Sequence, residues 1–121
     1  MNASVRRAVA YIAGRAVSGR RASSAYDFSS GKYTNFSGEV SDSKVAVYDF
    51  DAGCHVSGSR RGDRYSLYHY GISGHIDLSV KPNGTFSGYD YTSAAHFSGK
   101  VTGRSISLYD HGSGEYFNYS I

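Results

Sequence analysis

Three histidines occupy matching places along the chain, and their spacing is the first feature that suggests chemistry. His55, His75 and His96 each lie five residues beyond the end of a three-residue motif that begins with tyrosine. Imidazole is a common zinc ligand, so a shared metal site is one hypothesis. In consecutive β-hairpins, however, equivalent residues lie about 9.5 Å apart, and side chains that share one zinc ion must come much closer. The spacing therefore favours histidines packed against aromatic rings, and no metal or cofactor is expected.

Four aspartates and a further histidine form a second column, at the middle position of each such three-residue motif. Their positions have the parity of the apolar face, where a lone ionised carboxylate would be costly. They could lie at a solvated rim, cap the amides of their own turns, or meet arginines from the N-terminal segment. No aspartate differs from its counterparts as a catalytic residue usually does, so an enzyme is not expected. The column comprises Asp27, Asp49, His69, Asp90 and Asp110.

Cys54 is the only cysteine, so the chain cannot form an internal disulfide. Nucleophilic catalysis would require its thiol to converge on a base such as the neighbouring His55. Adjacent residues of a strand point to opposite faces, which keeps these two side chains apart. The sequence therefore predicts that Cys54 is a small residue of a turn.

A repeat of 20 to 22 residues places these columns. Its five three-residue motifs begin at Tyr26, Tyr48, Tyr68, Tyr89 and Tyr109. A short linker, which contains glycine in four of the five repeats, separates each three-residue motif from the next aromatic or histidine ring. In a hairpin with a two-residue loop, positions i and i+5 face each other across the strands. The repeat therefore predicts the cross-strand pairs Phe28–Tyr33, Phe50–His55, Tyr70–His75, Tyr91–His96 and His111–Tyr116.

Composition and alternation indicate the fold class. Twelve tyrosines, six phenylalanines and fifteen glycines accompany a single proline and no tryptophan, which argues against a helical bundle or a disordered chain. From Phe36 to Ile121 apolar and polar residues alternate, with four glycines in the apolar face. We predict a mainly β fold, an antiparallel β-meander of about ten short strands closed or strongly curled into a barrel-like sheet. A β-solenoid with one repeat per coil is the alternative.

Residues 1–23 are predicted to form a basic amphipathic helix that precedes a single, repeat-built β domain at residues 24–121. The helix spans Ser4–Ser18, with Ser4 as its N-cap and Gly19 at its end. Its alanine-rich stripe favours a helix packed on the surface of its own domain. A targeting segment is the other interpretation, because the segment is rich in arginine and lacks acids.

The net charge of +3 is unevenly distributed. Residues 1–26 hold five arginines and no acid, whereas the remainder holds eight basic and ten acidic side chains. A nucleic-acid-binding protein usually spreads Lys and Arg over its folded body, so nucleic acid is not an expected partner. No run approaches the roughly 18 apolar residues of a membrane helix, and a membrane is not expected either. The compartment is left open, with the cytoplasm slightly favoured because there is no clear signal peptide.

The polar face of the predicted sheet is the strongest functional hint. Its mixture of tyrosine, serine and histidine is typical of recognition surfaces. We therefore expect a soluble, non-enzymatic binding or structural module that contacts a protein or a carbohydrate. Self-assembly through unpaired terminal strands is an alternative, as is a small outer-membrane-type barrel. The candidate binding residues are Tyr48, Tyr68, Tyr89, Tyr109, His55, His75 and His96.

Overall fold

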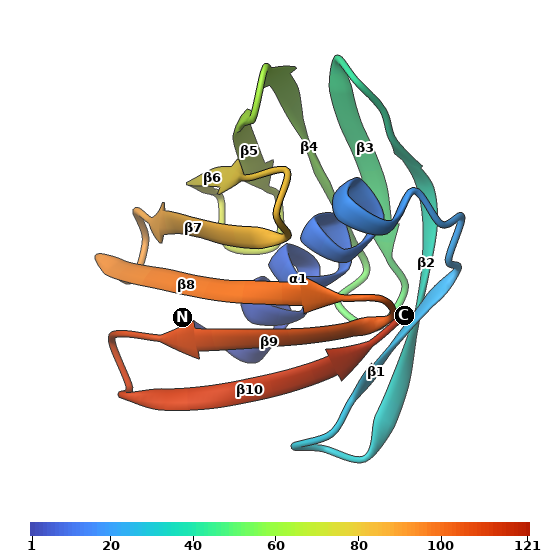
Figure 1. The fold of residues 1–121 in the computed structure, drawn as a ribbon. Coiled ribbons are helices and arrows are strands. Elements are labelled where there is room, and N and C mark those ends of the chain that lie inside the picture. The colour runs from blue at the N-terminus through green and yellow to red at the C-terminus, as the bar shows by residue number, and fades with distance from the viewer.

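The computed structural model describes residues 1–121 and contains one helix and ten strands. The strands form a closed antiparallel barrel around helix α1 (Ala3–Ser18), as Figure 1 shows. Each strand pairs with its neighbours in sequence, and β1 closes the barrel by pairing with β10. The predicted meander is therefore confirmed, and the β-solenoid does not form. The strands are β1 (Ser24–Asp27), β2 (Lys32–Val40), β3 (Lys44–Asp49), β4 (Cys54–Arg61), β5 (Arg64–His69), β6 (Gly74–Val80), β7 (Thr85–Asp90), β8 (Ala95–Thr102), β9 (Ser105–Asp110) and β10 (Glu115–Ser120).

The alternating apolar residues of the strands point into the barrel. Of the eighteen positions assigned to this face, only Val40, Phe117 and Ile121 are half-buried, and the others are buried. The intervening serines and tyrosines point outward, as the period of two requires. Alternation therefore identified which side chains the strands contribute to the core.

Glycines in the apolar face allow close approach between strands. A Cβ atom at Gly58 would overlap the carbonyl oxygen of Ser66 on the neighbouring β5. At the Phe86–Gly99 pair of β7 and β8, the phenylalanine ring covers the glycine opposite. These positions therefore leave room for the neighbouring backbone or for a bulky side chain.

Helix α1 runs through the interior of the barrel, so the prediction of a surface helix is wrong. Val5 and every residue from Ala8 to Gly14 are buried. Tyr11, which lies opposite the apolar stripe, is also 0% exposed. Its ring stacks on Phe36 of β2 with 4.1 Å between centroids, and its hydroxyl donates to the carbonyl of Ala22. A ten-strand barrel encloses more space than its inward side chains fill, and the helix occupies the remainder.

The ends of the helix follow ordinary capping chemistry. Gly19 ends it in the left-handed conformation, with φ of 68°, as predicted. The N-cap is Asn2 and not Ser4, because the Asn2 side chain accepts a hydrogen bond from the amide of Val5. The helix has sixteen residues, and the structure contains no helix that is long and apolar enough to cross a membrane.

The five hairpins at one end of the barrel have four-residue loops, so the predicted two-residue loops are wrong. Asp49, for example, pairs directly with Cys54, and residues 50–53 form the loop. The fourth loop residue is in the left-handed region in every hairpin, with φ between 49° and 71°. Two of these residues are not glycine, which concealed the loop type in the sequence. They are Gly31, Gly53, Ser73, Ala94 and Gly114.

Candidate functional site

The four-residue loops shift the strand register and change which rings meet. The predicted pairs, Phe28–Tyr33 and its four equivalents, are therefore wrong. The tyrosine that begins each three-residue motif instead lies opposite the ring on the next strand. The observed pairs are Tyr26–Tyr33, Tyr48–His55, Tyr68–His75, Tyr89–His96 and Tyr109–Tyr116.

Each hairpin carries a cluster of three rings on its outer face. In the β3–β4 hairpin the ring of Tyr48 lies 5.0 Å from that of Phe50 and 4.7 Å from that of His55. The other hairpins repeat this arrangement at similar distances, mostly with edge-on rings, the favourable geometry for aromatic pairs. We call these clusters the aromatic triplets: Tyr26/Phe28/Tyr33, Tyr48/Phe50/His55, Tyr68/Tyr70/His75, Tyr89/Tyr91/His96 and Tyr109/His111/Tyr116.

The loop-side ring of each triplet is open to solvent. Phe50 is 58% exposed and Tyr70 is 57% exposed. All large exposed hydrophobic residues of the protein belong to the triplets. These rings were not among the candidate binding residues predicted from the sequence, although each stands beside a hairpin loop. The exposed rings are Phe28, Tyr33, Phe50, Tyr70, Tyr91 and Tyr116.

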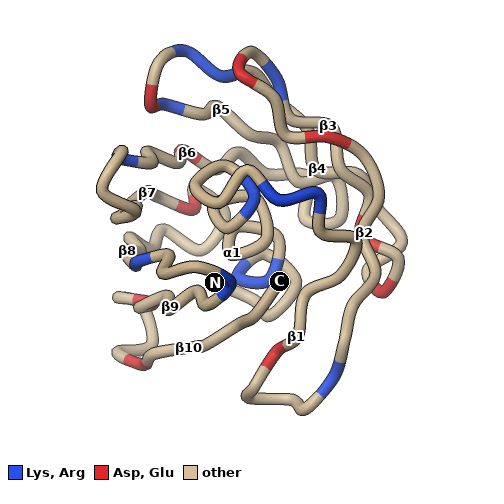
Figure 2. The backbone as a smooth tube through the Cα atoms, turned by 45° about the vertical axis from the view of Figure 1, so that its right-hand side comes forward, with Lys and Arg blue, Asp and Glu red and all other residues tan.

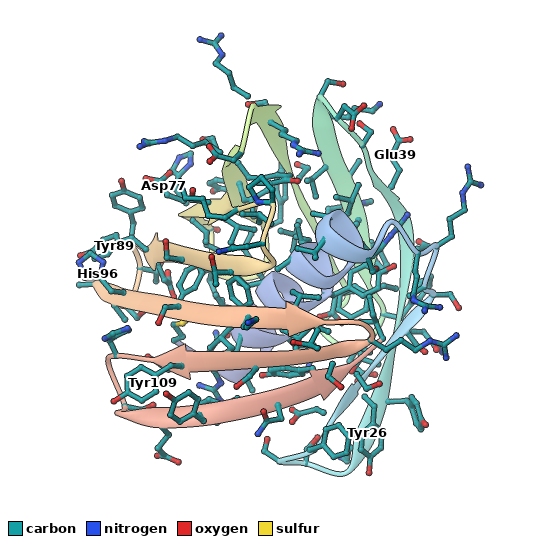
Figure 3. The ribbon with its side chains drawn as sticks, in the orientation of Figure 1. Tyr26, Glu39, Asp77, Tyr89, His96 and Tyr109 are labelled. Atoms are coloured by element: carbon teal, nitrogen blue, oxygen red, sulfur yellow. The ribbon has the colours of Figure 1, made fainter.

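The candidate residues from the sequence lie on separate hairpins around this rim. Tyr48 meets His55, Tyr68 meets His75, and Tyr89 meets His96. Figure 3 shows the last pair together at one edge of the barrel, with Tyr109 farther along the same rim. No three His, Cys, Asp or Glu side chains are close enough to hold a metal ion. The structure thus groups these residues in twos and threes, and never as one centre.

A groove on the outer face ends at one of the triplets. Its volume is about 640 Å³, and serine hydroxyls from three neighbouring strands line it. The Tyr109/His111/Tyr116 triplet closes one end, and Lys81 and Lys100 add positive charge. The groove therefore combines exposed rings with hydroxyl and ammonium donors. The serines are Ser87, Ser98 and Ser107.

Two loop-side rings are tied to neighbouring strands. The Tyr91 hydroxyl donates to the carboxylate of Asp77 at 2.7 Å, and the Nε2 atom of His111 lies 3.2 Å from the Ser98 hydroxyl. The hydrogen bond to Asp77 raises the pKa of Tyr91. Tyr91 therefore keeps its proton at neutral pH. These contacts hold the two rings in place while leaving them accessible.

The aspartate column lies inside the barrel, directly behind the aromatic triplets. Asp49 is 0% exposed, and its Oδ1 accepts hydrogen bonds from the amides of Asp51 and Ala52. Its Oδ2 accepts from Arg7 of the helix at 2.7 Å. Turn capping is thus confirmed, arginine pairing is found at Asp49 and Asp110 only, and the solvated rim is wrong. The other members, Asp27, His69, Asp90 and Asp110, are likewise buried and accept from amides of their own turns.

His69 replaces aspartate in this column and contacts the only cysteine. Its Nδ1 accepts from the amide of Gly71 at 3.2 Å and lies 3.9 Å from the sulfur of Cys54. Burial lowers the pKa of His69 and raises the pKa of Cys54. Both groups are therefore neutral at neutral pH, and Cys54 lacks the thiolate that nucleophilic catalysis needs.

Buried His69 predicts a loss of stability in mild acid. Its pKa is lowered by folding, so below about pH 6.5 the unfolded chain takes up a proton that the native state resists. The free energy of unfolding should fall by up to about 1.4 kcal/mol per pH unit from this group. Urea denaturation at about pH 7.5 and about pH 5.5 measures the effect.

The matched variant for this test is His69→Asn, whose side-chain oxygen can still accept from the amide of Gly71 but does not titrate. Its stability should depend less on pH over the same interval than that of the wild type. Identical pH profiles for the two proteins would contradict the assignment to His69.

Comparisons with protein-family models, with curated proteins and with solved structures find no match to this chain. The functional proposals below therefore rest on the chain's own geometry and chemistry.

Proposed function

We propose that this protein is a non-enzymatic binding module whose outer face contacts a carbohydrate. The observation that carries the proposal is the serine-lined groove, which ends at the Tyr109/His111/Tyr116 triplet. Tyr116 is 69% exposed and offers a flat apolar surface to the less polar face of a sugar ring. The hydroxyls of Ser98 and Ser107 lie beside it and can hydrogen-bond with sugar hydroxyls. Rigid tyrosines with adaptable serines are a combination favoured for recognition.

A protein surface is the second candidate, and the distribution of apolar area disfavours it. The centre of a protein interface is usually a contiguous, mostly apolar patch. Here the exposed rings are divided among five hairpins. Self-assembly by strand addition also loses its support, because β1 and β10 pair with each other in the closed barrel.

A glycan array followed by calorimetric titration with the best glycan tests the proposal. Tyr116→Ala should weaken binding about tenfold, the effect expected for an exposed aromatic anchor. Tyr70→Ala is the matched control, because Tyr70 belongs to an equivalent triplet but does not line the groove. Its affinity should stay within about twofold of the wild type.

Two outcomes would contradict this assignment. Equal losses in the two variants would place binding on the whole rim instead of the groove. Silence across the array, together with capture of a purified protein by the wild type and not by Tyr116→Ala, would replace the carbohydrate with a protein partner.

A further inference from the structure

The arginines of the N-terminal segment divide into two groups. Arg7 pairs with Asp49 at 2.7 Å, and Arg6 lies 3.6 Å from Asp110. These two side chains are therefore neutralised at the end of the barrel that carries the aromatic triplets. Three arginines, which lie near the end of α1 and in the following linker, form no ion pair with a carboxylate. They are Arg15, Arg20 and Arg21.

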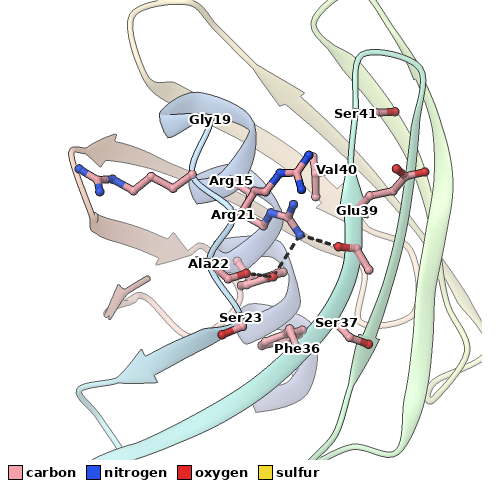
Figure 4. Close-up of a pocket in the computed structure, with 13 residues that line it drawn as sticks. Arg15, Gly19, Arg21, Ala22, Ser23, Phe36, Ser37, Glu39, Val40 and Ser41 are labelled. Atoms are coloured by element: carbon pink, nitrogen blue, oxygen red, sulfur yellow. Dashed lines mark hydrogen bonds between the residues drawn. The ribbon is translucent and has the colours of Figure 1, made fainter.

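The three unpaired arginines line one cavity at the opposite mouth of the barrel. Its volume is about 510 Å³, and it lies between the linker and β2. Figure 4 shows the side chains of Arg15 and Arg21 together in this cavity. In Figure 2 the linker includes the blue segment above and to the right of the α1 label. A smaller adjoining cavity of about 350 Å³ shares Arg20 and Arg21 and adds Arg104.

Little in the cavity offsets this positive charge. Glu39 is the only acidic residue that lines it, and its carboxylate pairs with Lys44 at 3.1 Å. Glu39 belongs to the outward-facing set of β2 and points away from the barrel interior (Figure 3). The carboxylate that could have neutralised the arginines is thus directed elsewhere.

The guanidinium of Arg15 is held in position by two hydrogen bonds, although one of its nitrogen atoms has no acceptor. Its Nη1 donates to the carbonyl of Gly38 at 2.9 Å and to the hydroxyl of Tyr11 at 3.2 Å. Its Nε is buried and has no hydrogen-bond partner. A fixed guanidinium that already contacts Tyr11 and β2 is preorganised for an oxyanion, because a ligand would not need to order it.

We propose that this cavity binds a small molecule through a phosphate group, with Arg15 and Arg21 as the principal ligands and Arg20 as additional positive charge. Guanidinium groups match the geometry of phosphate oxygens and bind them with charge-assisted hydrogen bonds. Up to three positive charges around one cavity suit a phosphate dianion better than a monovalent carboxylate. The stacked rings of Tyr11 and Phe36 lie beneath the cavity, buried against each other, and help to fix its floor. No residue lines both this cavity and the proposed carbohydrate groove on the outer face, so the two sites are independent.

Titration calorimetry of the whole chain with inorganic pyrophosphate, inorganic phosphate and acetate, at constant ionic strength, tests the proposal. Pyrophosphate should bind at one site per chain, inorganic phosphate more weakly, and acetate without measurable heat. Arg21→Gln should weaken the binding of pyrophosphate about tenfold or more, because it removes a charged hydrogen-bond donor. The matched control is Arg61→Gln, which removes the same charge from an exposed arginine outside the cavity and should change affinity less than about twofold.

Thermal unfolding provides a second readout. Bound pyrophosphate should raise the Tm of the wild type and of Arg61→Gln, and should raise the Tm of Arg21→Gln less, because a ligand stabilises the state that binds it. Equal losses of affinity in the two variants would mean general attraction of anions to a basic surface and would overturn the site. Absence of pyrophosphate binding to the wild type at millimolar concentration would overturn it as well.

Discussion

Removal of residues 1–18 is expected to abolish cooperative unfolding of the barrel. The deletion removes eight buried residues and leaves the centre of a ten-strand barrel without a core. Val5, Val9 and Ile12 are each 0% exposed, and burial of such a side chain contributes about 1.5–3 kcal/mol. Together with Tyr11 these contributions approach the whole stability of a typical domain, about 5–15 kcal/mol. Circular dichroism during heating measures the loss, and a deletion variant with a cooperative transition near that of the wild type would contradict it.

A pair of single substitutions separates loss of the helix from loss of its packing. Ile12→Asp places a carboxylate in the middle of the buried helix and should destabilise the fold by more than about 4 kcal/mol. Ala3→Asp makes a similar change at an exposed position in the first turn, where an acidic residue is favourable. The control should therefore retain or slightly raise the Tm. Equal Tm values for the two variants would mean that the helix lies at the surface.

Arg7→Met is expected to have the second largest effect, a loss of about 3–5 kcal/mol in the free energy of unfolding. Asp49 is fully buried, and Arg7 is its only charged hydrogen-bond partner. Without the guanidinium the carboxylate stays buried beside two turn amides, without a compensating charge. Chemical denaturation with urea measures the loss, which should appear as a lower midpoint at an unchanged slope.

The double variant Arg7→Met/Asp49→Asn identifies the cause. Asparagine keeps an oxygen that can cap the amides of Asp51 and Ala52 but carries no charge. The double variant should therefore be more stable than Arg7→Met alone, as a double-mutant cycle of two coupled residues requires. Additive losses would show that Arg7 acts only through packing. Arg6→Met should cost less, because Arg6 is farther from its carboxylate and makes no hydrogen bond with it.

Alternation along the strand predicts the direction of the Asp49 side chain but not its hydrogen-bond partner. Its alternation with the apolar residues predicted an inward side chain, and Asp49 is inward. Its partner Arg7 lies forty-two residues away in the chain, so no local pattern could choose between a turn cap and an ion pair. The structure contains both, because the two carboxylate oxygens accept from different donors.

The aromatic triplets show where local pattern was insufficient. The pairing of the rings depends on the length of the hairpin loops. A left-handed fourth residue sets the four-residue loop, and glycine would have signalled it. Ser73 and Ala94 adopt this conformation without being glycine. In these two hairpins the sequence therefore contains no glycine at the position that sets the loop length. A shift of two residues in register moved Phe50 from a predicted partner of His55 to an exposed ring beside Tyr48.

Alternation and turn residues indicated the strands, their inward and outward faces and a basic helix, and they favoured a meander while leaving a solenoid open. These properties follow from contacts between near neighbours, for which alternation and turn residues are sufficient. The position of the helix inside the barrel depends on closure of the sheet, because closure creates an interior volume that no local segment encodes. The same placement divided the five N-terminal arginines. Arg6 and Arg7 were carried to buried aspartates, and Arg15, Arg20 and Arg21 were left around one open cavity.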